Sequence, residues 1–347
     1  MFSKNLKYYR LRKAISKKDL AERIHVSPMA ISNYENGNRK PDMEILRRMA
    51  KELDIRVSDF LAVRNENLVF HHGEFRKNTA LTAAQQEYVQ ESVEEYFNRF
   101  MTVVEVLGGE VLPASPQCQM LKLSGKIEAD ALSLRRHLKF AENGPIEDLI
   151  GAMENKGILI YTCRIDSSSF SGMNGDINGR PYIITNQNMT PERCRSTLAH
   201  ELSHLMFNWP EDMPDAMIEE TATAISGAFL FPKLDAVREL GVRRTAVAGD
   251  MLMTAQEYGI SMFLLVKRAR LCGIVNSGAE KGFYIQASKE GWRKNEPARI
   301  KEEKPVLFEQ LVYRAVNENE ISIQRGAELL KVSYDEIIAH CCFGGLV

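Results

Sequence analysis

Hydrophobic residues in the first 61 positions recur every three or four residues, in short runs interrupted by polar residues. This spacing predicts short amphipathic helices rather than strands. Ser16 and Ser27 stand where N-caps are expected, Pro28 fits a first helical position, and Gly37 fits a helix end. We therefore predict five helices in this part of the chain, over residues 5–14, 17–24, 27–36, 41–53 and 57–61.

The pattern changes further along the chain. Residues 64–77 are polar and predict a linker, with His71 and His72 on a loop surface. Two short apolar runs, 158–164 and 181–186, predict strands, and the Gly-, Ser-, Asn- and Asp-rich residues 167–180 between them predict a loop. Longer stretches with helical spacing predict helices over residues 82–107, 129–140, 249–258, 261–272, 308–316, 323–330 and 334–341.

Helices therefore dominate the prediction. The fold class that we expect is α+β, mostly α, with one small sheet. A chain of 347 residues is long enough for several domains. We expect a five-helix bundle over residues 1–63, a linker and helical region over 64–128, a mixed α+β core over 129–235, and a C-terminal helical region over 236–347.

One predicted helix contains the sequence His200-Glu201-Leu202-Ser203-His204. Thr190, Pro191 and Glu192 mark its start, and Asn208-Trp209-Pro210 marks its end. Two histidines four residues apart lie on one face of a helix, so both imidazoles can bind one metal ion. The glutamate between them can act on a water molecule at that ion. The motif predicts a zinc-dependent peptidase with His200 and His204 as ligands and Glu201 as the catalytic base.

A catalytic zinc site usually has three protein ligands. Phe207 and Pro210 stand where an extended three-histidine motif would have its glycine and its last histidine, which excludes that pattern. The next helix, 215–231, offers two acids. At about 100° per residue, Glu219 flanks the apolar stripe of this helix and Glu220 points away from it. We therefore expect Glu219 to be the third ligand, with Glu220 as the alternative.

Charge separates the N-terminal part from the rest. Residues 1–61 contain fourteen Lys and Arg against eight Asp and Glu, a surplus of six, whereas the whole chain has a net charge of −1. A basic module on an otherwise acidic chain is typical of nucleic-acid binding. The second and third predicted helices are short and joined by a tight turn, which is the helix-turn-helix arrangement that places the second helix in the major groove.

The composition also indicates where in the cell the protein is located. The chain opens directly with an amphipathic helix, so we expect no secretion signal, and no apolar run approaches the roughly 20 residues that cross a bilayer. The six cysteines show no CxxC spacing. These features predict reduced thiols, no membrane association and a cytoplasmic location.

Several segments resemble the ImmA/IrrE-type metallopeptidases, most clearly over residues 145–232. Residues 145–150, 154–158 and 182–186 resemble the elements before the active-site helix, and 195–204 resembles that helix. Residues 219–232 resemble the second helix and align Glu219 with the family's ligand, with Thr223 in place of a usual Asn. The resemblance implies a zincin-like fold, Zn²⁺ as cofactor and a narrow substrate. That substrate would be a partner repressor, often of the Xre type, cleaved in a stress or mobile-element response.

Residues 15–27 and 31–41 resemble Xre/Cro-type repressor domains. The resemblance implies binding to double-stranded operator DNA, commonly as a homodimer. It places Ala21, Val26, Ile31 and Tyr34 in the core. The side chains that it implies for the major groove are Pro28, Met29, Ser32, Asn33 and Asn36, and those that it implies near phosphates are Lys17, Lys18, Arg39 and Lys40.

Two functions follow from these predictions. In the first, the chain is a DNA-binding zinc endopeptidase in which Glu201 transfers a proton from water to the leaving amine, while either predicted strand could pair with an extended substrate. In the second, it is an Xre-type regulator whose peptidase fold serves as a sensor or scaffold. The complete His-Glu-His set favours the first function, because a degenerate enzyme has no chemical need to keep Glu201.

Overall fold

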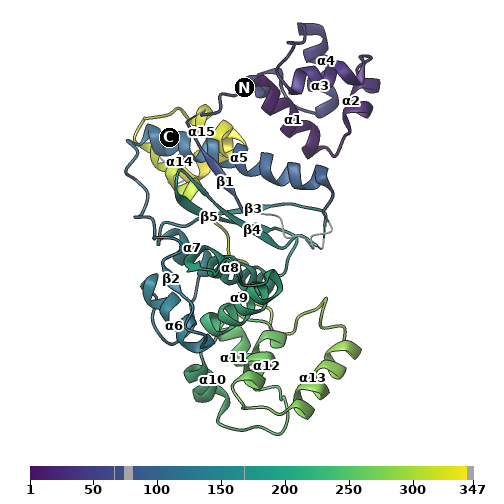
Figure 1. Cartoon of the computed structure of the whole chain (residues 1–347). Coiled ribbons are helices and arrows are strands. Elements are labelled where there is room, and N and C mark those ends of the chain that lie inside the picture. Colours follow the sequence, from purple (N-terminus) through teal and green to yellow (C-terminus); the bar gives the residue numbers. More distant parts are fainter. Residues whose placement is uncertain (66, 74–80, 168, 342–347) are drawn as a thin grey trace. The chain divides into compact units, whose positions relative to one another are not determined.

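The computed structural model describes residues 1–65, 67–73, 81–167 and 169–341. Its secondary structure is mostly helical with a small sheet, which confirms the predicted fold class (Figure 1). The described residues form two compact units. The first contains residues from 1–70, 81–112 and 308–341, and the second contains 71–73 and residues from 113–307. The range that we grouped as one C-terminal region, 236–347, is therefore divided between the two units.

The first unit begins with a bundle of five short helices that matches the prediction closely. Ser16 caps the second helix through a reciprocal capping box with Asp19, and the hydroxyl of Ser27 accepts a hydrogen bond from the backbone N–H of Ala30. Leu6, Leu20, Ile31, Tyr34, Met49 and Phe60 are buried in the centre of the bundle. The helices are α1 (Phe2–Arg12), α2 (Lys17–Arg23), α3 (Pro28–Glu35), α4 (Met43–Leu53) and the 3₁₀ helix η1 (Val57–Leu61).

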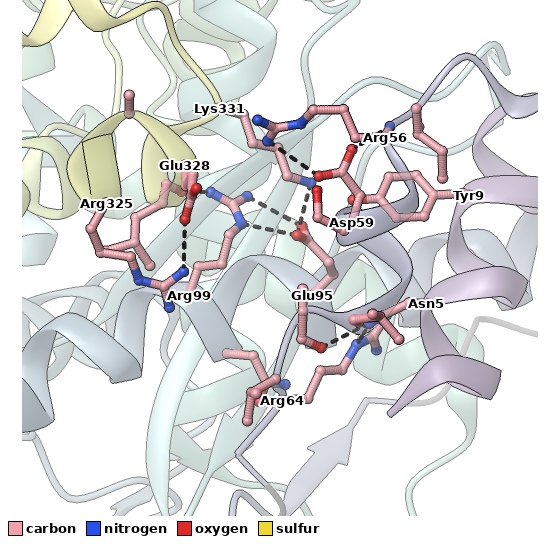
Figure 2. Close-up of a pocket in the computed structure, with 18 of the residues that line it drawn as sticks. Asn5, Tyr9, Arg56, Asp59, Arg64, Glu95, Arg99, Arg325, Glu328 and Lys331 are labelled. Carbon is pink, nitrogen blue, oxygen red and sulfur yellow. Dashed lines mark hydrogen bonds and ion pairs between the residues drawn. The ribbon is translucent and has the colours of Figure 1, made fainter. Parts of the chain in front are cut away.

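The first unit also contains α5 (Ala83–Val106) and the C-terminal helices α14 (Leu307–Asn317), α15 (Ile323–Leu330) and α16 (Tyr334–Cys341). Helices α1, α5 and α15 line a polar cavity of about 1010 Å³ (Figure 2). In this cavity, Glu95 accepts hydrogen bonds from Lys331 at 2.7 Å and from Arg99 at 2.9 Å. Burial alone would raise the pKa of Glu95, but the charges of Arg99 and Lys331 outweigh it and lower the pKa to about 2. Desolvation lowers the pKa of Lys331 to about 8, although the charge of Glu95 opposes that shift.

The second unit contains a four-stranded sheet in the order β1-β4-β5-β3. Strand β5 (Arg180–Asn186) is central, parallel to β3 (Leu159–Cys163) and antiparallel to β4 (Gly172–Ile177). The predicted loop over 167–180 is therefore wrong at residues 172–177. A tight turn at Asn178 and Gly179 joins β4 to β5, and both turn residues have positive φ, 51° and 80°.

Strand β1 (Phe70–His72) lies inside the predicted linker, so the prediction of a loop at His71 and His72 is wrong, although His71 is exposed as expected and His72 is half-buried. The last part of that predicted linker, 74–77, lies outside the described residues. A strand of three residues has too few side chains to show an alternating pattern in the sequence. Its pairing with β4 therefore could not be predicted from the sequence and is seen only in the structure.

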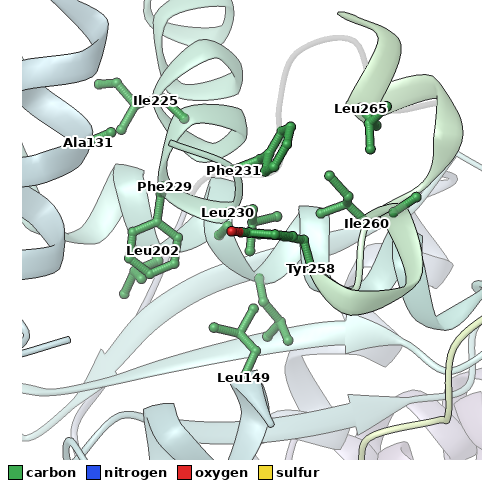
Figure 3. Close-up of a cluster of buried hydrophobic side chains, with 14 of the residues drawn as sticks. Ala131, Leu149, Leu202, Ile225, Phe229, Leu230, Phe231, Tyr258, Ile260 and Leu265 are labelled. Atoms are coloured by element: carbon green, nitrogen blue, oxygen red, sulfur yellow. The ribbon is translucent and has the colours of Figure 1, made fainter. Parts of the chain in front are cut away.

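Helices α8 (Pro191–Met206) and α9 (Asp215–Leu230) pack side by side, and α8 also contacts β4 and β5 (Figure 1). Leu202 of α8 and Ile225 and Phe229 of α9 lie in one buried cluster with Tyr258 and Ile260 (Figure 3). This core fixes the rotation of both helices about their axes. The other elements of the unit are β2 (Leu121–Lys122), which pairs with β6 (Phe207–Asn208), and helices α6 (Ile127–His137), α7 (Leu149–Glu154), α10 (Lys233–Leu240), α11 (Met251–Glu257), α12 (Met262–Leu271) and α13 (Ser277–Lys289).

Across the residues that the structure describes, no helix combines the length and the apolar character that crossing a bilayer requires.

Candidate functional site

Helix α8 presents its polar site residues on the face opposite its core contacts. Leu198 and Leu202 are fully buried in the hydrophobic cluster, which orients the helix. His200 and His204 follow each other one turn apart, and their rings lie with centroids 4.7 Å apart. His204 also contacts the ring of Trp209 just after the helix, at a centroid distance of 5.5 Å. These ring contacts limit the movement of the two imidazoles.

The two histidines and Glu219 of α9 direct their donor atoms to one point. The Nε2 atoms of His200 and His204 lie 3.0 Å apart. The carboxylate oxygens of Glu219 lie 3.4 Å from Nε2 of His200 and 3.3 Å from Nε2 of His204. Zinc bonds of about 2.05 Å in a tetrahedron place neighbouring donors about 3.3 Å apart. The residues present therefore fit a zinc ion. A search of the described residues for His, Cys, Asp or Glu side chains close enough to hold a metal finds this group.

The far side of His200 contacts Thr223 of α9. Nδ1 of His200 lies 3.3 Å from the Thr223 hydroxyl. When Nε2 binds a metal, Nδ1 must carry the ring proton, and the Thr223 oxygen is in position to accept it. Thr223 was noted in the sequence only as a departure from the family pattern, and its contact with His200 was not predicted.

Glu201 is buried beside the donor cluster and has a partner that the sequence analysis missed. Nδ2 of Asn174, on β4, donates a hydrogen bond of 2.8 Å to Oε2 of Glu201. Strand β4 can come this close because Gly172 has no side chain: a Cβ there would lie 2.6 Å from Cγ2 of Thr197. The Asn178-Gly179 pair, a strong hairpin signal, could have revealed β4 and so placed Asn174 near α8.

The structure separates the alternatives that the sequence left open. Glu219 is part of the donor cluster, whereas Glu220 is exposed to solvent. Of the two strands that we considered for substrate pairing, residues 181–186 lie in the central strand β5 and cannot offer a free edge. Strand β4, not either predicted strand, is the one that contacts Glu201. The strand predicted at 181–186 is confirmed as β5, but the prediction that it could pair with substrate is wrong.

The residues expected to contact DNA lie on and around α3. Pro28, Met29 and Asn36 are exposed, Ser32 and Asn33 are half-buried, and Arg39 and Lys40 are exposed in the following loop. On α2, Lys18 is exposed and lies 3.9 Å from Glu22. Lys17 instead lies 3.4 Å from Glu35, a buried acid that also pairs with Arg10. Lys17 therefore contributes to holding α2 against α3. Three of the expected core residues, Ala21, Ile31 and Tyr34, are buried, and Val26 is half-buried.

Comparison with known proteins agrees with both parts of this description. Residues 6–60 match the helix-turn-helix family model. Residues 153–270 match the model of the IrrE N-terminal-like domain, which begins in α7, contains both site helices and continues through most of α12. The chain is also similar to an uncharacterized HTH-type transcriptional regulator, YqaE, of Bacillus subtilis (strain 168), with 31% identity over 70 residues. That match covers 20% of this chain and 60% of the regulator. The chain thus joins a helix-turn-helix domain of the Xre type to a metallopeptidase-type domain of the ImmA/IrrE group.

Proposed function

We propose that this chain is a zinc-dependent endopeptidase, coupled to a DNA-binding domain, that cleaves a partner repressor of the Xre type. The observation that carries the proposal is the convergence of His200, His204 and Glu219 at tetrahedral spacing with Glu201 beside them. Two histidines and one glutamate form a known catalytic zinc set, in which the fourth position is left to water or substrate. The substrate class rests on the resemblance to ImmA/IrrE-type peptidases.

In the proposed reaction, His200, His204 and Glu219 hold the metal and Glu201 moves the proton. When bound, zinc would supply Lewis-acid chemistry, polarising the scissile carbonyl and acidifying a water molecule. The Glu201 carboxylate accepts a proton from the attacking water and transfers it to the nitrogen of the leaving amine. The amide of Asn174 donates a hydrogen bond to one oxygen of that carboxylate and so orients it. The Thr223 hydroxyl is in position to accept the Nδ1 proton of His200 when Nε2 of that ring binds the metal.

We expect the purified full-length chain to contain about one zinc ion and to cut a candidate Xre-type repressor at a defined bond. The measurement is metal analysis followed by incubation with repressors encoded next to it, with mass spectrometry of the products. A strong chelator should stop cleavage, and added zinc should restore it. A preparation that holds no zinc and cuts none of these repressors would favour the non-proteolytic regulator instead.

The DNA-binding part of the proposal rests on the surplus of positive charge in residues 1–61 and on the exposed face of α3. Helix α3 follows α2 after a short turn, and its exposed side chains lie near its N-terminal half, where recognition helices contact base edges. Asn33 carries an amide that can make two hydrogen bonds to adenine. Lys18, Arg39 and Lys40 would contact phosphates and add affinity without reading sequence.

We expect Asn33→Ala to weaken binding to the native upstream DNA by about 1–3 kcal/mol, and to weaken binding to unrelated DNA little, because a base contact is specific to its site. Lys40→Gln should weaken binding to both DNAs because it removes one phosphate contact. The slope of log K against log salt concentration should become shallower by about one. Mobility shifts over a series of salt concentrations measure both effects. Lys289→Gln, an exposed lysine of the second unit, is the matched control. Equal losses for Asn33→Ala on both DNAs would contradict the recognition role of Asn33.

A further inference from the structure

Strand β1 occupies the edge of β4 beside the candidate site. The backbone N–H of Gly73 donates a hydrogen bond of 2.8 Å to the carbonyl of Asn174. Nδ1 of His71 lies 3.0 Å from a carboxylate oxygen of Asp176, and Nδ1 of His72 lies 2.7 Å from the hydroxyl of Tyr182. These contacts run in opposite directions along the two segments, so β1 lies antiparallel to β4.

The fit between these two backbones depends on glycine on both sides. A Cβ on Gly73 would lie 2.6 Å from the carbonyl oxygen of Asn174. A Cβ on Gly175 would lie 2.4 Å from the carbonyl oxygen of His71. Both distances are far shorter than a van der Waals contact, so a side chain at either position would push the strands apart. The close approach of β1 to β4 thus requires glycine at two positions of the sequence, 73 and 175.

The edge of β4 is also where an extended peptide would reach Glu201. An extended substrate binds a sheet edge by adding a strand, with main-chain hydrogen bonds that do not depend on its sequence. Asn174 belongs to both arrangements, because its carbonyl accepts from Gly73 while its side chain donates to Glu201. A peptide that paired with β4 at Asn174 would need the hydrogen-bonding group that Gly73 now uses.

Strand β1 is poorly anchored for a permanent member of a sheet. It has three residues, none of them buried, and the His71 side chain is 67% exposed. Short strands with exposed backbone hydrogen bonds open at low free energy. The central strand β5, in contrast, has six buried residues out of seven. Detachment of β1 would therefore leave the rest of the sheet intact.

We propose that residues 71–73 act as an internal occupant of the substrate-binding edge, which a peptide substrate must displace before cleavage. This inference rests on the proposed peptidase function. Only molecules in which the edge is open can bind substrate, so the apparent affinity is the intrinsic affinity multiplied by the open fraction. The occupant therefore raises KM and leaves the chemical step unchanged.

The first test needs no substrate. Amide hydrogen exchange of the full-length protein should show Gly73 and its neighbours in β1 exchanging at least about 100-fold faster than the amides of β5. If β1 and β5 exchange equally slowly, β1 is a permanent strand and the proposal fails. This outcome is independent of whether the protein cuts anything.

The second test uses Gly73→Ala, which adds the clashing Cβ, and Gly73→Pro, which removes the donated N–H. With the repressor that the wild type cuts, both variants should lower KM by about 2- to 12-fold, the range expected for one net hydrogen bond, with kcat unchanged. Gly249→Ala, where a Cβ meets nothing within 4 Å, is the control. Zinc content and circular dichroism verify that each variant is folded. An unchanged KM, or a fall in kcat, would overturn the inference, whereas a wild type that cuts nothing would count against the proposed function instead.

Discussion

Glu201→Gln is expected to abolish cleavage while leaving the metal in place. Gln has nearly the same shape as Glu and can still accept the hydrogen bond from Asn174 through its amide oxygen, but it cannot accept a proton from water. Loss of a general base costs about 10³-fold in kcat. Because Glu201 is not one of the three convergent donors, zinc content should stay near that of the wild type. The measurement compares kcat on the repressor with metal content in the same preparations.

This combination separates a catalytic role from a structural one. A variant that lost activity because it unfolded would also lose its zinc. Glu211→Gln, an exposed acid in the same unit, provides the matched control and should behave as the wild type does. The inactive Glu201→Gln protein should also retain intact repressor long enough to be isolated as a complex. Cleavage at the wild-type rate would mean that another group takes the proton, and the assignment of Glu201 would fail.

The site helices could be predicted from the sequence because their signals are local. Thr190 and Pro191 mark the start of α8, and the spacing of Leu198 and Leu202 gives its buried face. From these positions alone, His200 and His204 fall together on the opposite side. The choice of Glu219 over Glu220 followed from a single angle around α9, and the structure indeed directs only Glu219 toward the histidines.

The strand beside the site could not be predicted in the same way. The buried face of strand β4 has Gly175 between Met173 and Ile177, so only two apolar side chains mark the alternation and the composition resembles a loop. The two glycines of this strand allow close approach, Gly172 to α8 and Gly175 to β1 and Tyr182. The composition therefore reflects tertiary contacts that are absent from the local sequence. Asn174 and its hydrogen bond to Glu201 were missed for this reason.

The sequence also could not predict that the last three helices, α14 to α16, belong to the first unit. Lys331 binds Glu95 across 236 positions of sequence, and neither residue has a distinctive local pattern. Lys331 also adopts a left-handed conformation, with φ of 59°, at the end of α15, a position that usually favours Gly or Asn. Its contacts with Glu95 and the ring of Tyr8 hold it in that conformation. Only the folded chain shows why a lysine stands there.

The third ligand can be tested by a matched pair of substitutions on one helix. We expect Glu219→Gln to lower zinc affinity more than the roughly 10- to 100-fold typical of losing a ligand's hydrogen-bonding partner, because it replaces a direct carboxylate donor with a neutral amide. Cleavage should fall with it at limiting zinc. Glu220→Gln changes the same charge one residue further on, at an exposed position outside the donor cluster, and should leave zinc affinity unchanged.

Competition with a chromogenic chelator measures the affinity of the wild type and both variants under the same conditions. The comparison removes the general effect of losing one negative charge from α9, because both substitutions lose it. If Glu220→Gln releases the metal and Glu219→Gln keeps it, the ligand assignment is reversed. If both variants keep the metal, neither glutamate is the third ligand, and another side chain supplies that donor. The expected order, with Glu219→Gln far weaker than Glu220→Gln and the wild type, follows from the distances of 3.3 and 3.4 Å that join Glu219 to both imidazoles.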